Sequence, residues 1–163
     1  MPGLSNSKGN LTFLKKRYDA NKAAGEKLVG SDFWMVINGH TNMSILIRTA
    51  QLPEIAREDV EDFAPSGMKF SQYGAYRNSG EIACTAQETL TGLVLTMVKN
   101  AVINKEMVDI DFYLAPESMG GEGNTPIARL EDCKLNTDAV DLSAEDVTAL
   151  VRPNIRIVYN WHE

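Results

Sequence analysis

The sequence predicts one small α+β domain, mainly β, in which about six strands surround a single central helix. The chain has 163 residues, and a length of about 150 residues is typical of one domain. Several short apolar segments are separated by glycine, proline and asparagine, a pattern that favours strands joined by turns. Only one longer segment repeats its apolar residues clearly with the period of a helix face.

The first two predicted strands form a hairpin. Phe33–Ile37 is apolar throughout, Asn38-Gly39 is a hairpin turn signal, and segment 43–50 is the expected partner strand. Later strands are expected where apolar runs follow glycines or turn-rich stretches, over 68–73, 81–87, 127–135 and 155–159.

Segment 88–101 is the predicted central helix. Its apolar residues recur at the spacing of one helix face, namely at Leu90, Leu93, Val94, Met97, Val98 and Ala101. Glu88 and Thr89 near the start suit the free N–H groups of a first turn, and Lys99 near the end suits the helix dipole. We expect this apolar face to cover the sheet as part of the core.

Segment 108–113 alternates apolar and polar residues, which predicts a half-buried strand. The alternation sends Asp109 and Asp111 to one face and the apolar residues to the other. Paired carboxylates on a strand can serve acid–base chemistry, but alternating acids more often mark a solvated face. A glycoside hydrolase that used Asp109 with a second carboxylate would need a concave pocket around it.

Charge divides the chain into a basic arm at 1–30 and a main domain at 31–163. The arm holds six of the 16 basic residues against two of the 22 acidic ones, so the remainder is strongly acidic. Within the arm, segment 11–24 predicts a short helix with a basic outer face, and Asn10 is its expected N-cap. An acidic body repels phosphate, which disfavours tight binding of nucleic acid.

Segment 51–66 predicts a long exposed excursion rather than a central strand, because it contains two prolines and a dense acidic cluster. The cluster, Glu58, Asp59, Glu61 and Asp62, lacks the spacing and glycine of a calcium loop. We therefore expect a solvated or partner-facing segment.

No pattern in the sequence indicates an enzyme, a metal site or a cofactor. The two histidines, His40 and His162, lie far apart, and the loop Gly120–Asn124 lacks the pattern of a phosphate-binding loop. Cys84 and Cys133 have no metal-binding spacing, so buried free thiols are expected, with an inter-subunit disulfide as the alternative. No apolar run is long enough to span a membrane, and no secretory signal follows the N-terminus.

From about Asp32 through Trp161 the chain resembles tail tube proteins of bacteriophages with contractile tails. Three features carry the resemblance: the aromatic-led strand Phe33–Ile37, the turn and Ala-x-Leu-Pro stretch over 47–53, and the terminal strand over 155–161 that ends in aromatic residues. The resemblance implies two packed antiparallel sheets, of sandwich or barrel type, with one flanking helix. The basic arm is longer than the family pattern leads us to expect.

The resemblance implies a non-enzymatic virion protein, made in the host bacterial cytoplasm, whose hexameric rings stack into the tail tube for DNA ejection. Its implied partners are further copies of itself, the tail sheath, baseplate and tail terminator proteins, the tape measure protein, and double-stranded DNA in transit. A tube subunit of type VI secretion, which shares the fold, and a monomeric binding module are the alternatives.

Two surfaces follow from this interpretation. The excursion over 52–76, with Arg57, Glu58, Asp59, Glu61, Asp62 and Phe63, is expected to join one ring to the next. Asp109 and Asp111 are expected to line the channel, where repeated carboxylates would let DNA pass without retention.

Overall fold

The computed structural model describes residues 8–119 and 125–163, so the glycine-rich segment Gly120–Asn124 lies outside the described residues. Contacts along the chain divide it into two compact units, Met1–Ser31 and Asp32–Glu163. The described part of the first unit contains helix α1 (Leu11–Ala23). Asn10 caps this helix as predicted, since its side chain accepts a hydrogen bond from the Phe13 amide at 3.0 Å. No residue of α1 is buried within this unit.

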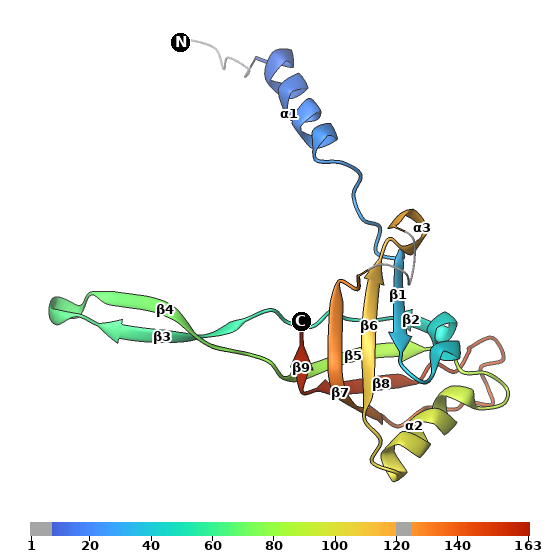
Figure 1. The fold of residues 1–163 in the computed structure, drawn as a ribbon. Helices are drawn as coiled ribbons and strands as arrows, with labels where there is room; N and C mark the ends of the chain where they lie inside the picture. Colours follow the sequence, from blue (N-terminus) through green and yellow to red (C-terminus); the bar gives the residue numbers. More distant parts are fainter. Residues whose placement is uncertain (1–7, 120–124) are drawn as a thin grey trace. The chain divides into compact units, whose positions relative to one another are not determined.

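Six antiparallel strands of the second unit curve into a nearly closed barrel (Figure 1). Their spatial order is β1, β6, β7, β8, β5 and β2, and the short strand β9 pairs with β7. Their bounds are β1 Phe33–Ile37, β2 Ile47–Thr49, β5 Gly80–Ala86, β6 Val108–Leu114, β7 Ala128–Thr137, β8 Asn154–Tyr159 and β9 Trp161–His162. The predicted class, a mainly β domain built from two antiparallel sheets, is confirmed.

Strand β7 belongs to both sheets because it bends in the middle. Its first half pairs with β6 and β9, and its second half pairs with β8. At the bend, Asp132 has a φ of 52°, and the β6–β7 register shifts between Val108 and Ile110. The Asp132 amide donates to the Asp109 carboxylate at 3.2 Å, which satisfies a group that the bulge removes from the ladder.

Helix α2 (Leu93–Ile103) covers the core, as the periodicity predicts. Val94, Met97, Val98 and Ala101 are buried in one cluster with residues of both sheets. The helix begins later than predicted, after Gly92, and Leu90 lies fully exposed. Glu88 still serves the helix start, because its carboxylate accepts hydrogen bonds from the Val94 and Leu95 amides.

The predicted hairpin over 33–50 is wrong. β1 pairs with β6, while segment Thr41–Leu46 forms the 3₁₀ helix η1 and β2 pairs with β5. The turn itself exists, since the His40 amide donates to the Ile37 carbonyl and Gly39 has a φ of 86°. The chain then enters η1, which buries Met43 in the core instead of returning along β1.

We predict that Met97→Ala lowers the free energy of unfolding by about 2–5 kcal/mol, because it removes a buried side chain and leaves a cavity. Met97 is 6% exposed, whereas Val102 on the same helix is 50% exposed. Val102→Ala is the matched control and should cost much less. Urea denaturation of both variants measures the difference, and equal losses would show that the buried face has been misassigned.

Candidate assembly surfaces

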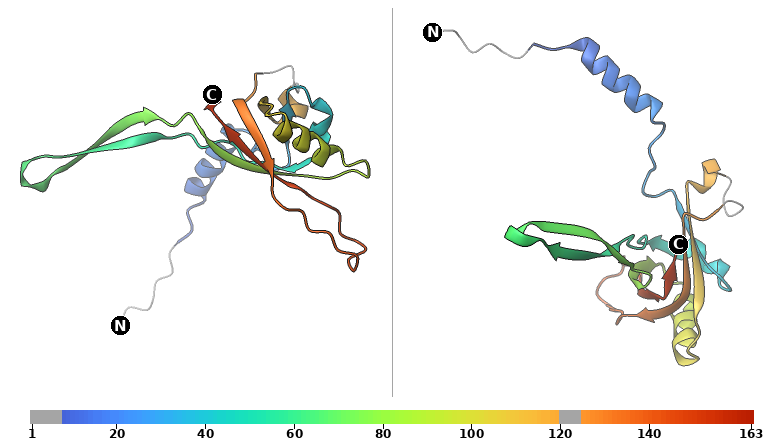
Figure 2. Two further views of the ribbon diagram at one scale, coloured as in Figure 1. Left: turned by 90° about the horizontal axis from the view of Figure 1, so that it is seen from below. Right: turned by 60° about the vertical axis from the view of Figure 1, so that its left-hand side comes forward.

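A two-stranded hairpin projects from the barrel and carries the residues predicted to join rings (Figures 1 and 2). It consists of β3 (Arg57–Phe63), the 3₁₀ turn η2 (Pro65–Gly67) and β4 (Lys69–Tyr76), and we refer to it as the hairpin. The two strands form a sheet of their own, separate from the barrel strands. Every residue of β3 is exposed.

The acidic segment was expected to be a long exposed excursion rather than a central strand; it is exposed, but it forms a strand in a two-stranded sheet outside the barrel. β3 pairs with β4 from Phe63, opposite Lys69, to Asp59, opposite Tyr73, before a bulge shifts the register. Prolines 53 and 65 flank β3 instead of interrupting it. Lys69 forms a 2.6 Å salt bridge with Glu61, which reduces charge repulsion along the acidic strand.

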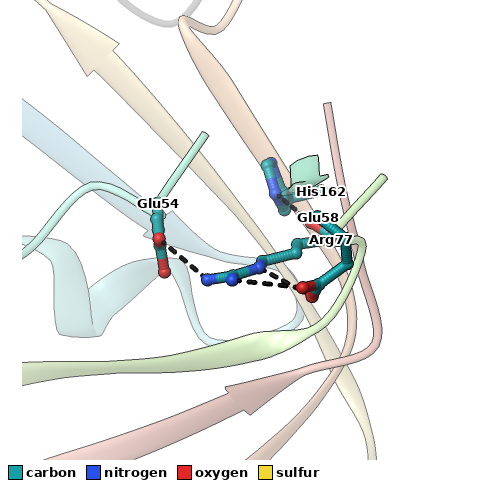
Figure 3. Close-up of polar contacts among 4 residues, drawn as sticks. All are labelled: Glu54, Glu58, Arg77 and His162. Carbon is teal, nitrogen blue, oxygen red and sulfur yellow. Dashed lines mark hydrogen bonds and ion pairs between the residues drawn. The ribbon is translucent and has the colours of Figure 1, made fainter. Parts of the chain in front are cut away.

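Arg77 ties both legs of the hairpin together at its base (Figure 3). Its guanidinium contacts Glu58 of β3 at 2.8 Å and Glu54, which precedes β3, at 3.3 Å. The hydrogen bond to Glu58 and the attraction of both carboxylates raise the pKa of Arg77 above its ordinary value. All three side chains are substantially exposed, so we assign the cluster to orientation of the hairpin rather than to stability.

His162 anchors the same base from the barrel side and is 3% exposed. Its Nε2 donates to the Arg77 carbonyl at 3.1 Å, and the Tyr76 hydroxyl donates to the His162 carbonyl at 3.1 Å. The His162 ring also packs edge-on against Tyr159, whose ring lies over Gly80. A Cβ at position 80 would lie 2.6 Å from the Tyr159 hydroxyl, so this close packing requires glycine. The sequence alone could not predict this role of His162, because its partners Tyr76 and Arg77 lie more than 80 positions away in the chain.

Asp109 and Asp111 lie on one face of β6, as the alternation predicts, but they are not free carboxylates. Arg129 lies directly opposite Asp111 on β7, and its guanidinium is within 3.9 Å of both aspartates and 3.6 Å of Glu131. Asp111 is only 8% exposed, so the expectation that both acids are solvated is wrong for this residue. The cluster still holds three carboxylates around one guanidinium.

The loop 138–153, between β7 and β8, is a second projecting element (Figure 2). The described residues of this loop form no helix or strand. Asp146 accepts hydrogen bonds from the Thr148 and Ala149 amides, and these bonds lower the pKa of its carboxyl. The end of the loop is fastened to the segment after β5, because the Glu88 amide donates to the Val151 carbonyl at 3.0 Å.

Cys84 and Cys133 are buried and form no disulfide within the chain, as the prediction of buried free thiols expects. Burial raises the pKa of each thiol to about 12, so neither is ionised near neutral pH. Within residues 8–119 and 125–163, no group of three or more histidine, cysteine or acidic side chains is arranged to hold a metal ion. Among the same residues, no helix is long and apolar enough to cross a membrane.

We predict that His162→Ala lowers the free energy of unfolding by about 1–3 kcal/mol, because it removes a buried ring and its hydrogen bond to the Arg77 carbonyl. His40 is the matched control, since its side chain is 30% exposed and its contact with Glu106 is 3.8 Å long. His40→Ala should change stability by no more than about 0.5 kcal/mol. Thermal unfolding of both variants decides the point, and an unaffected His162→Ala variant would contradict the anchoring role.

No protein-family model matches the sequence, and no curated protein matches it significantly. Solved structures do match the fold. A chain of the PVC sheath–tube complex of an extracellular contractile injection system, in the extended state, has a TM-score of 0.64 and 14% identity. The match covers 88% of this chain and 95% of that one.

Two further solved structures match with similar scores. The PVC sheath/tube terminator has a TM-score of 0.63 and 13% identity over 85% of this chain and 96% of that one. The tube-terminating cap of the anti-feeding prophage has a TM-score of 0.62 and 13% identity over 100% and 97%. The chain therefore has the fold found in components of contractile injection systems.

Proposed function

We propose that the protein is a tube subunit of a contractile tail, non-enzymatic, whose hexameric rings stack into the channel for DNA ejection from a bacteriophage virion. The observation that carries the proposal is the exposed hairpin on a barrel of this fold. Its strands present Phe63, Phe70 and Tyr73 to solvent, at 65%, 60% and 82% exposure. A surface of this kind indicates a partner that covers it.

The barrel also offers two lateral edges for ring formation. β1 and β2 stand at the two ends of the strand order, so each is paired with one barrel strand only. Unpaired edges invite uncontrolled pairing, and closure of identical subunits into a ring covers them. The ring would meet a sheath protein on its outside and baseplate and terminator proteins at its ends, and would hold a tape measure protein before DNA passes.

A tube subunit differs from a cap or terminator in how it assembles. A tube subunit adds to its own kind repeatedly, which requires complementary surfaces at both ends of the barrel. The hairpin and the loop 138–153 both project from the barrel, which favours the tube. A secretion tube of the type VI kind would assemble in the same way and differ in its cargo.

We predict that the purified protein forms long tubes, and that a variant without the outer hairpin forms single rings. Asp59 and Tyr73 are paired, so Asn-Gly in place of residues 60–72 closes a shorter hairpin without breaking the barrel. Negative-stain microscopy checks both proteins. Single rings of the wild type at every concentration would indicate a cap or terminator, monomers would indicate a binding module, and tubes of the variant would exclude the hairpin from stacking.

We also propose that the β6 face with Asp109 and Asp111 lines the channel, because the Arg129 cluster is acidic and would repeat around the ring. Asp109→Asn keeps the acceptor for the Asp132 amide, and Glu131→Lys changes a side chain that is 42% exposed. We predict that tubes with both changes retain double-stranded DNA at low salt and release it at high salt. Filter binding measures retention, and no difference from wild type would place this face outside the channel.

A further inference from the structure

The hairpin and the loop 138–153 lie at opposite ends of strand β5. Gly80 opens the strand close to the hairpin base and pairs with Tyr159. Thr85, near the other end, pairs with Asn154, the first residue after the loop. At about 3.3 Å per residue, the two ends are roughly 20 Å apart. Figures 1 and 2 show the hairpin and the loop leaving the barrel in different directions from these ends.

The tip of the hairpin is apolar and exposed. Phe63, Met68 and Phe70 surround the η2 turn, with exposures of 65%, 71% and 60%. The other acidic residues of β3 lie nearer the base, so the charges close to the tip are Asp62 and the ion pair of Lys69 with Glu61. Three large apolar side chains on so small an element indicate an apolar receptor.

The loop 138–153 borders an open hollow of about 760 Å³, lined by residues of the loop and by Asn154. The lining includes Leu142 and Leu150, which are 80% and 67% exposed, together with small apolar residues. Asp141, Asp146 and Arg152 supply charge of both signs around it. Arg152 is itself held in place, since its Nε donates to the Gln87 side chain at 3.2 Å.

We propose that the hairpin tip of one subunit enters the hollow of the loop 138–153 in a second copy of the chain. The inference rests on the proposed tube and names the surface that the hairpin meets in the next ring. A projection at one end of the barrel and a hollow at the other let identical subunits add head to tail without limit. The rigid length of β5 keeps the hairpin away from the loop of its own subunit.

Charge favours the same pairing. Lys69 is already paired with Glu61 of its own hairpin, so the free charge near the tip is Asp62, which Arg152 of the hollow complements. The other candidate occupant is helix α1 of a neighbouring copy, which is basic and exposes Leu14 at 57%. The aromatic tip is favoured because the tip and the hollow lie at opposite ends of β5, so that each subunit could contact one copy at each end.

Disulfide crosslinking in assembled tubes tests the pairing. The two native cysteines are buried with a thiol pKa of about 12, so introduced cysteines react against a silent background. Oxidation of Met68→Cys/Leu150→Cys tubes should give a ladder of linked subunits on a denaturing gel. Leu14→Cys/Leu150→Cys tubes should give none, and linking of this pair in preference to the first would assign the hollow to α1 and overturn the proposal.

A mixing experiment tests the same contact without a covalent bond. Phe70→Asp disables the tip, Leu150→Asp disables the hollow, and Val147→Asp is the control, because Val147 is 91% exposed and does not line the hollow. Each of the first two should reduce sedimented tubes about tenfold or more. Preformed rings of the two should then combine into ring pairs, because one intact tip meets one intact hollow.

The outcomes separate this inference from the proposed function. If wild-type protein forms no tubes, the proposed function fails before the contact is tested. If wild-type tubes form, but the Leu150→Asp variant polymerises normally or the mixture gives no ring pairs, the tip does not enter the hollow. Circular dichroism of each variant confirms that the barrel is folded.

Discussion

The bend in β7 is the constraint on which the rest of the barrel depends. A straight strand could belong to one sheet only, but a bulge at Asp132 lets β7 pair with β6 on one side of the bend and β8 on the other. The left-handed backbone at this residue is accessible to aspartate more readily than to bulky or β-branched residues. The Asp109 carboxylate then satisfies the displaced amide. This one local irregularity thus lets residues of both sheets pack into a single hydrophobic core.

The same bend determines where the projecting elements lie. In the second sheet β8 pairs with β7 and β5 pairs with β8, and the ends of β8 and β5 fix the positions of the loop 138–153 and the hairpin. The hairpin base is held by buried contacts of Tyr76 and His162 and by the exposed cluster around Arg77. Its outer part is a two-stranded sheet whose residues are almost all exposed. A base fixed to the barrel and an exposed outer part suit an element that a partner covers.

Local periodicity revealed those elements whose burial is local. The apolar face of α2 and the alternation in β6 could be predicted because each pattern depends only on which side of that element faces the core. The pairing of β1 with β6 could not, because Asn38-Gly39 makes the same turn whether a strand or the 3₁₀ helix follows. β3 was missed because its strand structure comes from β4, and the acidic composition opposes it. Arg129, which changes the setting of Asp109 and Asp111, lies on a strand distant in the sequence.

Unlike projections at the two ends of β5 give any stack of these subunits a direction. One terminus of such a filament presents a crown of aromatic tips, and the other presents empty loops. Proteins that start or stop the filament must therefore bind different surfaces, and a protein that binds one terminus would not bind the other. Growth would proceed from a starter that occupies only one of the two surfaces, so a long particle with two different ends could be built from identical subunits.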